Sequence, residues 1–228
     1  MTPKAIVTDV EGTTSSIAFV HEMLFPYART RLARFVAANA MRLDDELAQV
    51  RAASGRPDLD LAGAIDQLLE WHDADQKVAP LKSVQGMIWA EGYADGTLIG
   101  HVYPDAIAGL ARWHAHGIAL YVYSSGSVAA QKLLFAHTAA GDLTPLFAGH
   151  FDTAVGAKRD SASYREIARR IAREPDDILF LSDSIAELAA AREAGLRVML
   201  LARDGVPVDP GYPLATSFDI ILAESLAA

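Results

Sequence analysis

The chain has 228 residues, of which 51% are hydrophobic, and its formal net charge is −9. A chain of this length can bury a substantial core, and we expect one domain with an insertion. It has no block of basic residues, so we expect no nucleic-acid partner. The absence of cysteine excludes disulfides and thiolate metal sites. No leader pattern and no membrane-length apolar run is present, so we expect a cytoplasmic protein without a membrane partner.

The first half of the chain predicts one strand and then a helical segment. Residues 4–9 are the expected first strand, because they contain the apolar run Ala5, Ile6 and Val7, which is typical of a buried strand. Residues 17–100 place apolar side chains at helical spacing, without a strand of comparable length. The expected helices cover residues 27–38, 43–53, 62–71 and 81–93, and the polar segment 54–58 separates two of them. We therefore interpret residues 17–100 as a helical insertion.

After residue 100 the predicted strands and helices alternate. The expected helices cover residues 104–116, 128–137, 161–173 and 185–194, and the expected strands cover residues 118–123, 178–181, 197–201 and 219–222. This alternation predicts an α/β fold with a doubly wound parallel sheet and right-handed crossovers. The sequence thus predicts a doubly wound, Rossmann-like core in residues 1–16 and 101–228, with residues 17–100 as a helical insertion.

Polar side chains follow three of the predicted strands. Asp9 ends the first strand, Ser124 follows the strand over residues 118–123, and Asp183 follows the strand over residues 178–181. Because the carboxyl ends of parallel strands meet at one edge of a sheet, we expect these side chains to converge there. Lys158 lies in a polar stretch between them and is the only lysine after residue 132.

The acidic turn after the first strand has two interpretations. Asp9 and Glu11, followed by a glycine and two threonines, can hold a hard divalent cation against a phosphate. A carboxylate in such a turn can also attack phosphorus and become an aspartyl-phosphate. The alternative is a strand that ends in an ordinary polar turn, and the turn alone does not decide between them.

Phosphoryl transfer would give each of these residues a role. Asp9 is the predicted nucleophile and Glu11 the predicted general acid and base. One Mg²⁺ would bind to Asp9, Asp183 and a carbonyl near Glu11, because this ion prefers hard oxygen ligands. The alternative for Asp183 is to cap the helix that begins beside it.

Four further residues complete the candidate site. Ser124 and Ser125 would bind phosphate through a hydroxyl and backbone N–H groups, although either could simply cap the following helix. Lys158 would neutralise Asp9 and the phosphate. Glu187 would either orient a ligand of the metal or stabilise the N-terminus of its own helix.

The order of acid pair, hydroxyl, lysine and acid resembles the four-part signature of the haloacid dehalogenase-like phosphohydrolases. Within that superfamily the chain is similar to the enolase-phosphatase E1 family, also called acireductone synthases. The similar segments are residues 9–14 (DVEGTT), 25–28 (FPYA), 85–89 (QGMIW), 123–135 (YSSGSVAAQKLLF), 151–153 (FDT) and 156–158 (GAK). Residues 203–207 follow the family pattern only loosely, and no role is assigned to them.

The resemblance implies two reactions in one Mg²⁺-dependent site of methionine salvage. The substrate would be 2,3-diketo-5-methylthiopentyl-1-phosphate, which is enolised and then dephosphorylated to 1,2-dihydroxy-3-keto-5-methylthiopentene. Most related phosphatases carry aspartate where this chain has Glu11, and the longer side chain suits proton transfer at carbon as well as oxygen. The helical insertion would act as a cap that holds the methylthio tail, with Trp89, Met87 and Phe19 as candidate contacts. Lys82 would reach the diketone or the phosphate, or would simply be a surface lysine. Packing within the cap is the alternative that we favour for Met87 and Phe19.

Other functions remain compatible with parts of this pattern. A phosphatase or mutase for another small phosphoester, such as a sugar phosphate, would use the same fold, but Glu11 and the segment around Trp89 argue against it. A binding protein without turnover would not need the acids, hydroxyl and lysine together. A dehalogenase would need neither the second acid nor the metal. We expect a monomer whose partner is a small phosphoester.

Overall fold

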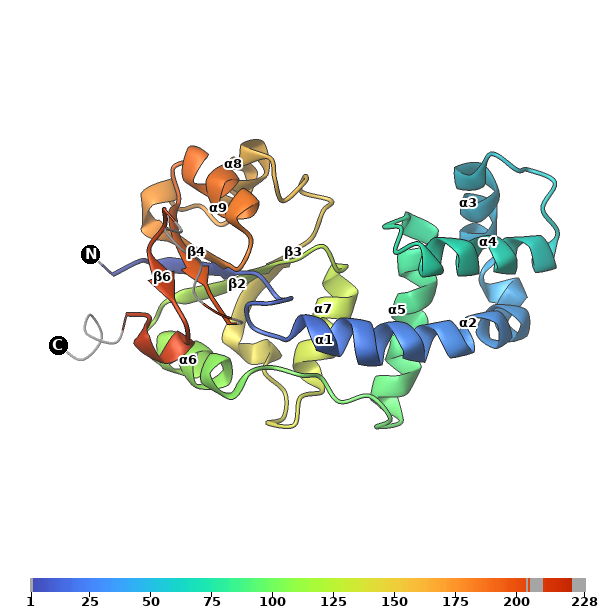
Figure 1. Ribbon diagram of the computed structural model, residues 1–228, viewed down its shortest axis with the longest axis horizontal. Helices are drawn as coiled ribbons and strands as arrows, with labels where there is room; N and C mark the ends of the chain where they lie inside the picture. Colours follow the sequence, from blue (N-terminus) through green and yellow to red (C-terminus); the bar gives the residue numbers. More distant parts are fainter. Residues whose placement is uncertain (1, 204, 206–210, 223–228) are drawn as a thin grey trace. The chain divides into compact units, whose positions relative to one another are not determined.

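The computed structural model describes residues 2–203, 205 and 211–222 (Figure 1). The chain divides into two compact units, one formed by Met1–Ile17 and Gly100–Ala228 and the other by Ala18–Ile99. Each unit has a hydrophobic core of its own. None of the helices within the described ranges is both long enough and apolar enough to span a bilayer.

The first unit is built on a parallel sheet with the strand order β3-β2-β1-β4-β5-β6. The strands are β1 (Ala5–Thr8), β2 (Ala119–Tyr123), β3 (Phe147–Phe151), β4 (Ile178–Ser182), β5 (Arg197–Leu201) and β6 (Leu214–Ala215). Every residue of β1 and β4 is buried, as expected for central strands covered on both faces. Because the chain moves outward from β1 first toward β3 and then toward β6, the carboxyl ends of β1 and its neighbours form a topological switch point.

Helices cover both faces of this sheet. They are α6 (Pro104–Ala115), α7 (Val128–Ala136), α8 (Ser161–Arg170) and α9 (Ile185–Glu193). Residues of α8 and α9 share one core cluster with Val7, Phe180 and Val198, which therefore point to the same sheet face. Figure 1 shows α6 and α7 on the opposite side of the sheet. The predicted α/β fold with a doubly wound parallel sheet is confirmed.

The prediction of a strand over residues 219–222 is wrong. Residues Phe218–Ile220 form a short 3₁₀ turn instead, and the Ser217 hydroxyl accepts the Asp219 N–H at its start. The ring of Phe218 stacks on that of Trp113 in α6, with 5.1 Å between the centroids. The turn therefore packs against a helix through Phe218, and it has no place in the sheet.

Two strands were not predicted from the sequence. The edge strand β3 contains Gly149 and His150, and none of its five residues is fully buried, so it lacks the apolar run of the central strands. The other strand, β6, has only two residues, which is too short to give a recognisable pattern. Both strands lie at edges of the sheet, where burial constrains the sequence least.

The second unit is helical, and its four long helices lie where the sequence predicts them. They are α2 (Phe25–Asn39), α3 (Asp44–Ser54), α4 (Leu61–Asp73) and α5 (Ala79–Ala94), preceded by the short α1 (Ile17–Phe19) and a π-helical turn, Val20–Leu24. Its core contains Leu32 of α2, Leu68 of α4 and Ile88 of α5, so three helices contribute to the same core. Gly55 ends α3 with a φ of 68°, and the Asp60 carboxylate caps α4 by accepting the Gly63 N–H at 2.8 Å.

Three residues considered as substrate contacts have clear packing positions in this unit. Phe19 is buried, and the Trp89 indole donates a hydrogen bond to the Leu24 carbonyl at 2.8 Å. Met87 packs against the core and also lines a pocket of about 430 Å³ with Phe35 and other residues of α2 and α5. Neither Phe19 nor Trp89 lines that pocket.

Candidate active site

The acidic turn that follows β1 is closed by its own backbone. The Val10 carbonyl accepts N–H groups from Thr13, Thr14 and Ser15 at 3.2, 3.0 and 2.8 Å, and the Thr14 hydroxyl donates to the Asp9 carbonyl at 3.0 Å. Gly12 has a φ of 72°, and a Cβ there would overlap the Asp183 carboxylate. Only glycine allows this backbone conformation and this close approach without strain.

The Asp9 carboxylate is held in a fixed orientation. Its side chain is only 7% exposed. Its Oδ1 accepts the Val10 N–H at 2.7 Å and lies 2.6 Å from Lys158 Nζ, while its Oδ2 accepts the Ser182 hydroxyl at 3.4 Å. Such contacts restrict rotation of the carboxylate, which favours a defined line of attack on a bound group.

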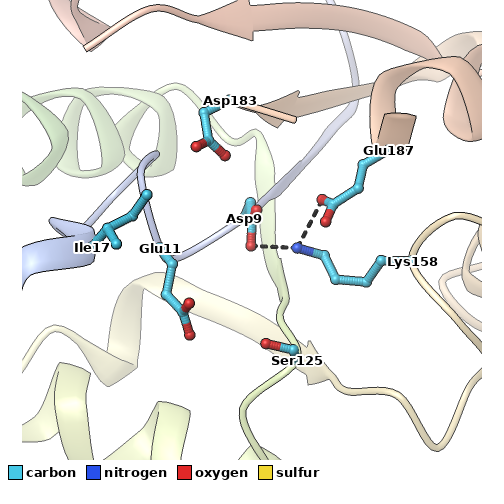
Figure 2. A pocket seen from close by; sticks show the side chains of 7 residues that line it. All are labelled: Asp9, Glu11, Ile17, Ser125, Lys158, Asp183 and Glu187. Carbon is cyan, nitrogen blue, oxygen red and sulfur yellow. Dashed lines mark ion pairs between the residues drawn. The ribbon is translucent and has the colours of Figure 1, made fainter. Parts of the chain in front are cut away.

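A pocket of about 180 Å³ lies at this edge of the sheet, entirely within the first unit (Figure 2). It is lined by Asp9, Glu11, Ile17, Ser125, Lys158, Asp183 and Glu187. Six residues singled out from the sequence, all of the lining except Ile17, therefore come together here from four separate segments of the chain. Figure 2 shows the Lys158 ammonium between Asp9 and Glu187, with Glu11 on the other side of Asp9 from Glu187.

Ser124 is not among the residues that line the pocket. It is buried, and its hydroxyl accepts the Gly126 N–H at 3.1 Å, which shapes the turn on which Ser125 stands. The helix cap that we considered for these two serines is instead Ser127, whose hydroxyl accepts the Ala130 N–H. The role of Ser124 and Ser125 as phosphate ligands stays a prediction.

The turn after β2 is also fixed from α7 by Gln131. This buried side chain donates hydrogen bonds of 2.8 Å to two carbonyls, those of Gly126 and Phe151. The Asp152 carboxylate accepts the Val128 N–H at the start of α7. These contacts join the ends of β2 and β3, and they place Ser125 in the pocket.

Lys158 stands on a loop between β3 and α8 whose backbone is held by three hydroxyl groups. Tyr123 donates to the Gly156 carbonyl at 2.9 Å, Ser163 to the Ala157 carbonyl at 2.8 Å, and Tyr164 to the Lys158 carbonyl at 2.7 Å. The two tyrosine rings meet edge to face, with centroids 5.5 Å apart. The backbone of Lys158 is therefore fixed, although its side chain is long and flexible.

Glu187 has a contact that the sequence did not suggest. It lies in the first turn of α9, as expected, and its Oε2 is 2.8 Å from Lys158 Nζ and accepts the Ser182 hydroxyl at 3.1 Å. Burial lowers the pKa of Lys158, but the charges of Asp9 and Glu187 more than reverse this, so its net pKa is raised. The lysine is therefore a permanent cation shared by two carboxylates.

Asp183 does not cap a helix, because the N-cap of α9 is Ser184 and no side chain bonds there. Its backbone N–H instead donates to the Thr13 hydroxyl at 3.1 Å, which ties it to the acidic turn. Burial and the nearby charge of Asp9 raise the pKa of Asp183 to about 6. The carboxylates of this pocket therefore repel one another.

This group of residues fits a magnesium ion. Four carboxylates and one ammonium line the pocket, so it carries excess negative charge. In the part of the chain that the structure describes, no three His, Asp or Glu side chains form a complete metal site by themselves. Mg²⁺ does not require that, because it usually keeps several waters and binds one or two carboxylates together with phosphate oxygens. The assignment of Asp9, Asp183 and a backbone carbonyl near Glu11 as its protein ligands stays a prediction.

Comparison with known proteins identifies the family. Residues 3–195 match the model of the haloacid dehalogenase-like hydrolases. An enolase-phosphatase E1 from Methylococcus capsulatus is 52% identical over 225 residues, covering 98% of this chain and 99% of its own length. An enolase-phosphatase E1 from Pseudomonas aeruginosa is 54% identical over 226 residues, covering 98% of this chain and 100% of its own length.

A solved structure agrees with these relatives. The UTR4 protein of Saccharomyces cerevisiae superposes with a TM-score of 0.81 at 31% sequence identity, covering 96% of this chain and 99% of that one. The family match and the parallel sheet define a haloacid dehalogenase-like hydrolase. More narrowly, the chain belongs to the enolase-phosphatase E1 family.

Proposed function

We propose that this protein is an Mg²⁺-dependent enolase-phosphatase of methionine salvage. It would convert 2,3-diketo-5-methylthiopentyl-1-phosphate to 1,2-dihydroxy-3-keto-5-methylthiopentene and phosphate. The observation that carries this proposal is the meeting of Asp9, Glu11, Lys158 and Asp183 in one pocket at the carboxyl ends of the strands. The similarity to enolase-phosphatases E1 over 98% of the chain supports the choice of substrate.

Phosphate release would proceed in two displacements. The Asp9 carboxylate attacks phosphorus and the bond from phosphorus to the ester oxygen breaks, while Glu11 donates a proton to that leaving oxygen. Glu11 then takes a proton from water, the water oxygen attacks phosphorus, and phosphate leaves Asp9. Lys158, 2.6 Å from Asp9, would stabilise the negative charge that gathers around phosphorus.

The metal would be bound by Asp9, Asp183 and the Glu11 carbonyl. A bound Mg²⁺ would supply positive charge that favours both the phosphoryl transfer and the enolisation. Holding these ligands in place is the task of the acidic turn and of the Asp183 N–H bond to Thr13.

The enolase step moves a proton from carbon to oxygen before the ester is cleaved. Glu11 is the candidate for this proton transfer as well, because it lines the pocket beside the nucleophile and reaches one methylene further than aspartate. We also propose that the helical unit acts as a cap that excludes water and binds the methylthio tail. In support, the chain leaves the first unit at Ile17, which lines the pocket, and returns at Gly100.

The test is to supply the diketo phosphate ester and to follow the enol by ultraviolet absorbance and phosphate separately. The account predicts both products with Mg²⁺ and neither with excess chelator. Phosphoglycolate and a sugar phosphate serve as comparison substrates. If either is hydrolysed with a much higher kcat/KM than the diketo ester, the alternative of a phosphatase for another small phosphoester is correct. The expected monomer and cytoplasmic location stay predictions.

A further inference from the structure

Arg203 is a buried cation next to the pocket, and nothing in the sequence assigned it a role. It follows the end of β5 by two residues, at the same edge of the sheet as Asp9 and Asp183. Its side chain is only 9% exposed. It does not line the pocket, so it would act on the site through other residues.

One side of the Arg203 guanidinium binds the acidic turn. Its Nε and Nη2 atoms both donate to the Thr13 carbonyl, at 3.1 and 2.9 Å. The hydroxyl of this same Thr13 accepts the Asp183 N–H at 3.1 Å. Thr13 therefore connects Arg203 both to the turn that carries Asp9 and Glu11 and to the start of the segment that carries Asp183.

The other side of the guanidinium is anchored to the body of the first unit. Its Nη1 donates to Asp105 Oδ2 at 2.7 Å, and that oxygen also accepts the Phe218 N–H at 2.8 Å. The guanidinium carbon lies 4.2 Å from the ring centroid of Tyr103 and 5.2 Å from that of Phe218. The Tyr103 N–H in turn donates to the Thr14 carbonyl at 2.9 Å. The carbonyls of two consecutive residues, Thr13 and Thr14, therefore accept hydrogen bonds from Arg203 and from Tyr103, which lie against each other.

We infer that Arg203 is a positioning residue that fixes the acidic turn, so that Asp9, Glu11 and Asp183 converge on one metal and one phosphate; this inference rests on the proposed function. An ion pair with Asp105 alone would not need arginine. A planar guanidinium can donate to a carbonyl and to a carboxylate at once, whereas a lysine ammonium lacks this fixed fork. Supporting residues of this kind typically change metal affinity or activity by about 10–100-fold.

The experiment compares Arg203→Lys and Arg203→Met with a matched control, Arg112→Met. Arg112 also binds the Phe218 segment, through a 2.9 Å hydrogen bond from Nη2 to the Phe218 carbonyl, but it makes no described contact with the acidic turn. The first measurement is amide hydrogen exchange of residues 10–15 in the metal-free protein. The second is Mg²⁺ affinity together with kcat and KM for p-nitrophenyl phosphate.

We expect faster exchange of the Thr13, Thr14 and Ser15 amides in both Arg203 variants and not in Arg112→Met. Mg²⁺ affinity or kcat should fall about 10–100-fold, with KM changed less, because Arg203 does not touch the ester. Circular dichroism shows which variants are folded, and only those are compared. If Arg203→Met does not fold, Arg203→Lys still tests the inference, because it keeps a positive charge beside Asp105.

Wild-type exchange of these amides and wild-type kcat in the folded Arg203 variants would overturn the inference. Equal changes of amide exchange and kcat in Arg112→Met would overturn it too, because they would show that the changes come from disturbing the Phe218 segment. If the wild-type protein hydrolyses no phosphoester with Mg²⁺, the proposed function fails instead, and the amide exchange still decides whether Arg203 holds the turn.

Discussion

Asp9 accepts a backbone N–H and a serine hydroxyl and pairs with the Lys158 ammonium, and these contacts fix a carboxylate that lines the pocket. Asparagine at this position would keep nearly the same shape but is a far poorer nucleophile. We predict that Asp9→Asn folds normally and loses phosphate release by several orders of magnitude. Circular dichroism and a phosphate assay check this, and substantial phosphate release by the folded variant would end the assignment of Asp9.

Glu11 tests whether one side chain serves both reactions. We predict that Glu11→Gln slows enol formation and phosphate release by about 10²–10⁴-fold, the usual contribution of general acid–base catalysis. Glu11→Asp should keep more p-nitrophenyl phosphate hydrolysis than diketone enolisation, because p-nitrophenolate leaves without a proton and only the attacking water still needs the acid. Equal losses in the two assays, with unchanged metal affinity, would mean that the length of Glu11 is incidental.

A substitution of Asp183 tests whether the pocket binds Mg²⁺. Its carboxylate contacts the pocket beside Asp9, and the amide of asparagine is a weaker ligand for Mg²⁺ than a carboxylate. We predict that Asp183→Asn raises the Mg²⁺ concentration needed for half-maximal hydrolysis, and that Ca²⁺ supports hydrolysis poorly because its larger shell misplaces the phosphate. Full activity in excess chelator, with metal verified absent, would contradict the metal mechanism.

At the scale of elements, the loop between β3 and α8 depends on hydroxyl groups from its neighbours. Tyr164→Phe removes the donor to the Lys158 carbonyl and keeps the ring that packs on Phe180. We predict a loss of about 1 kcal/mol in the free energy of unfolding and a lower kcat, because Lys158 loses part of its support. Tyr121→Phe is the control, since its ring also packs on the β-sheet core but no described contact joins it to this loop. Equal kcat in both variants would show that the hydroxyl is dispensable.

The sequence predicted the central elements and missed the edges for physical reasons. Burial on both faces makes β1 and β4 continuous apolar runs that end in acids, and these are easily recognised. The edge strand β3 is only partly buried, so its composition is not distinctive. Residues 219–222 showed the opposite error, because this apolar segment begins in a 3₁₀ turn whose Phe218 stacks on Trp113 of α6 outside the sheet.

The pocket was predictable in part for a related reason. Residues at the ends of strands, such as Asp9 and Asp183, are placed by topology alone. The partners of Glu187 and Arg203 depend on which loops fold back to the same edge, and neither position had a local pattern that revealed it. The order of Lys158, Glu187 and Ser182 around Asp9 became visible only in three dimensions.

At the scale of the whole molecule, His150 links stability to pH. Burial and the charge of Lys132 lower the pKa of His150 to about 4, whereas it would be near 6.5 in the unfolded chain. The unfolded state therefore binds the proton more readily, and stability falls as pH drops from about 6.5 toward 4. Allowing for the partial exposure of the ring, we expect this histidine to lower the free energy of unfolding by about 1–2 kcal/mol over that pH range.

Denaturant unfolding at several pH values checks this expectation. The difference between wild type and His150→Gln should shrink as pH falls, because the variant has no proton to bind. The exposed His116→Gln serves as control and should leave the pH dependence unchanged. A pH-independent difference between wild type and His150→Gln would show that this histidine is not the linked group.

If Asp9 carries the phosphoryl group between the two displacements, peptide mass spectrometry of Glu11→Gln should detect it there. With p-nitrophenyl phosphate the leaving group needs no proton, so the first displacement should proceed while attack by water is slow. After acid quenching, we expect a phosphate adduct on Asp9 that is absent without Mg²⁺. An adduct on another residue, or phosphate release with no adduct at any time, would contradict this expectation.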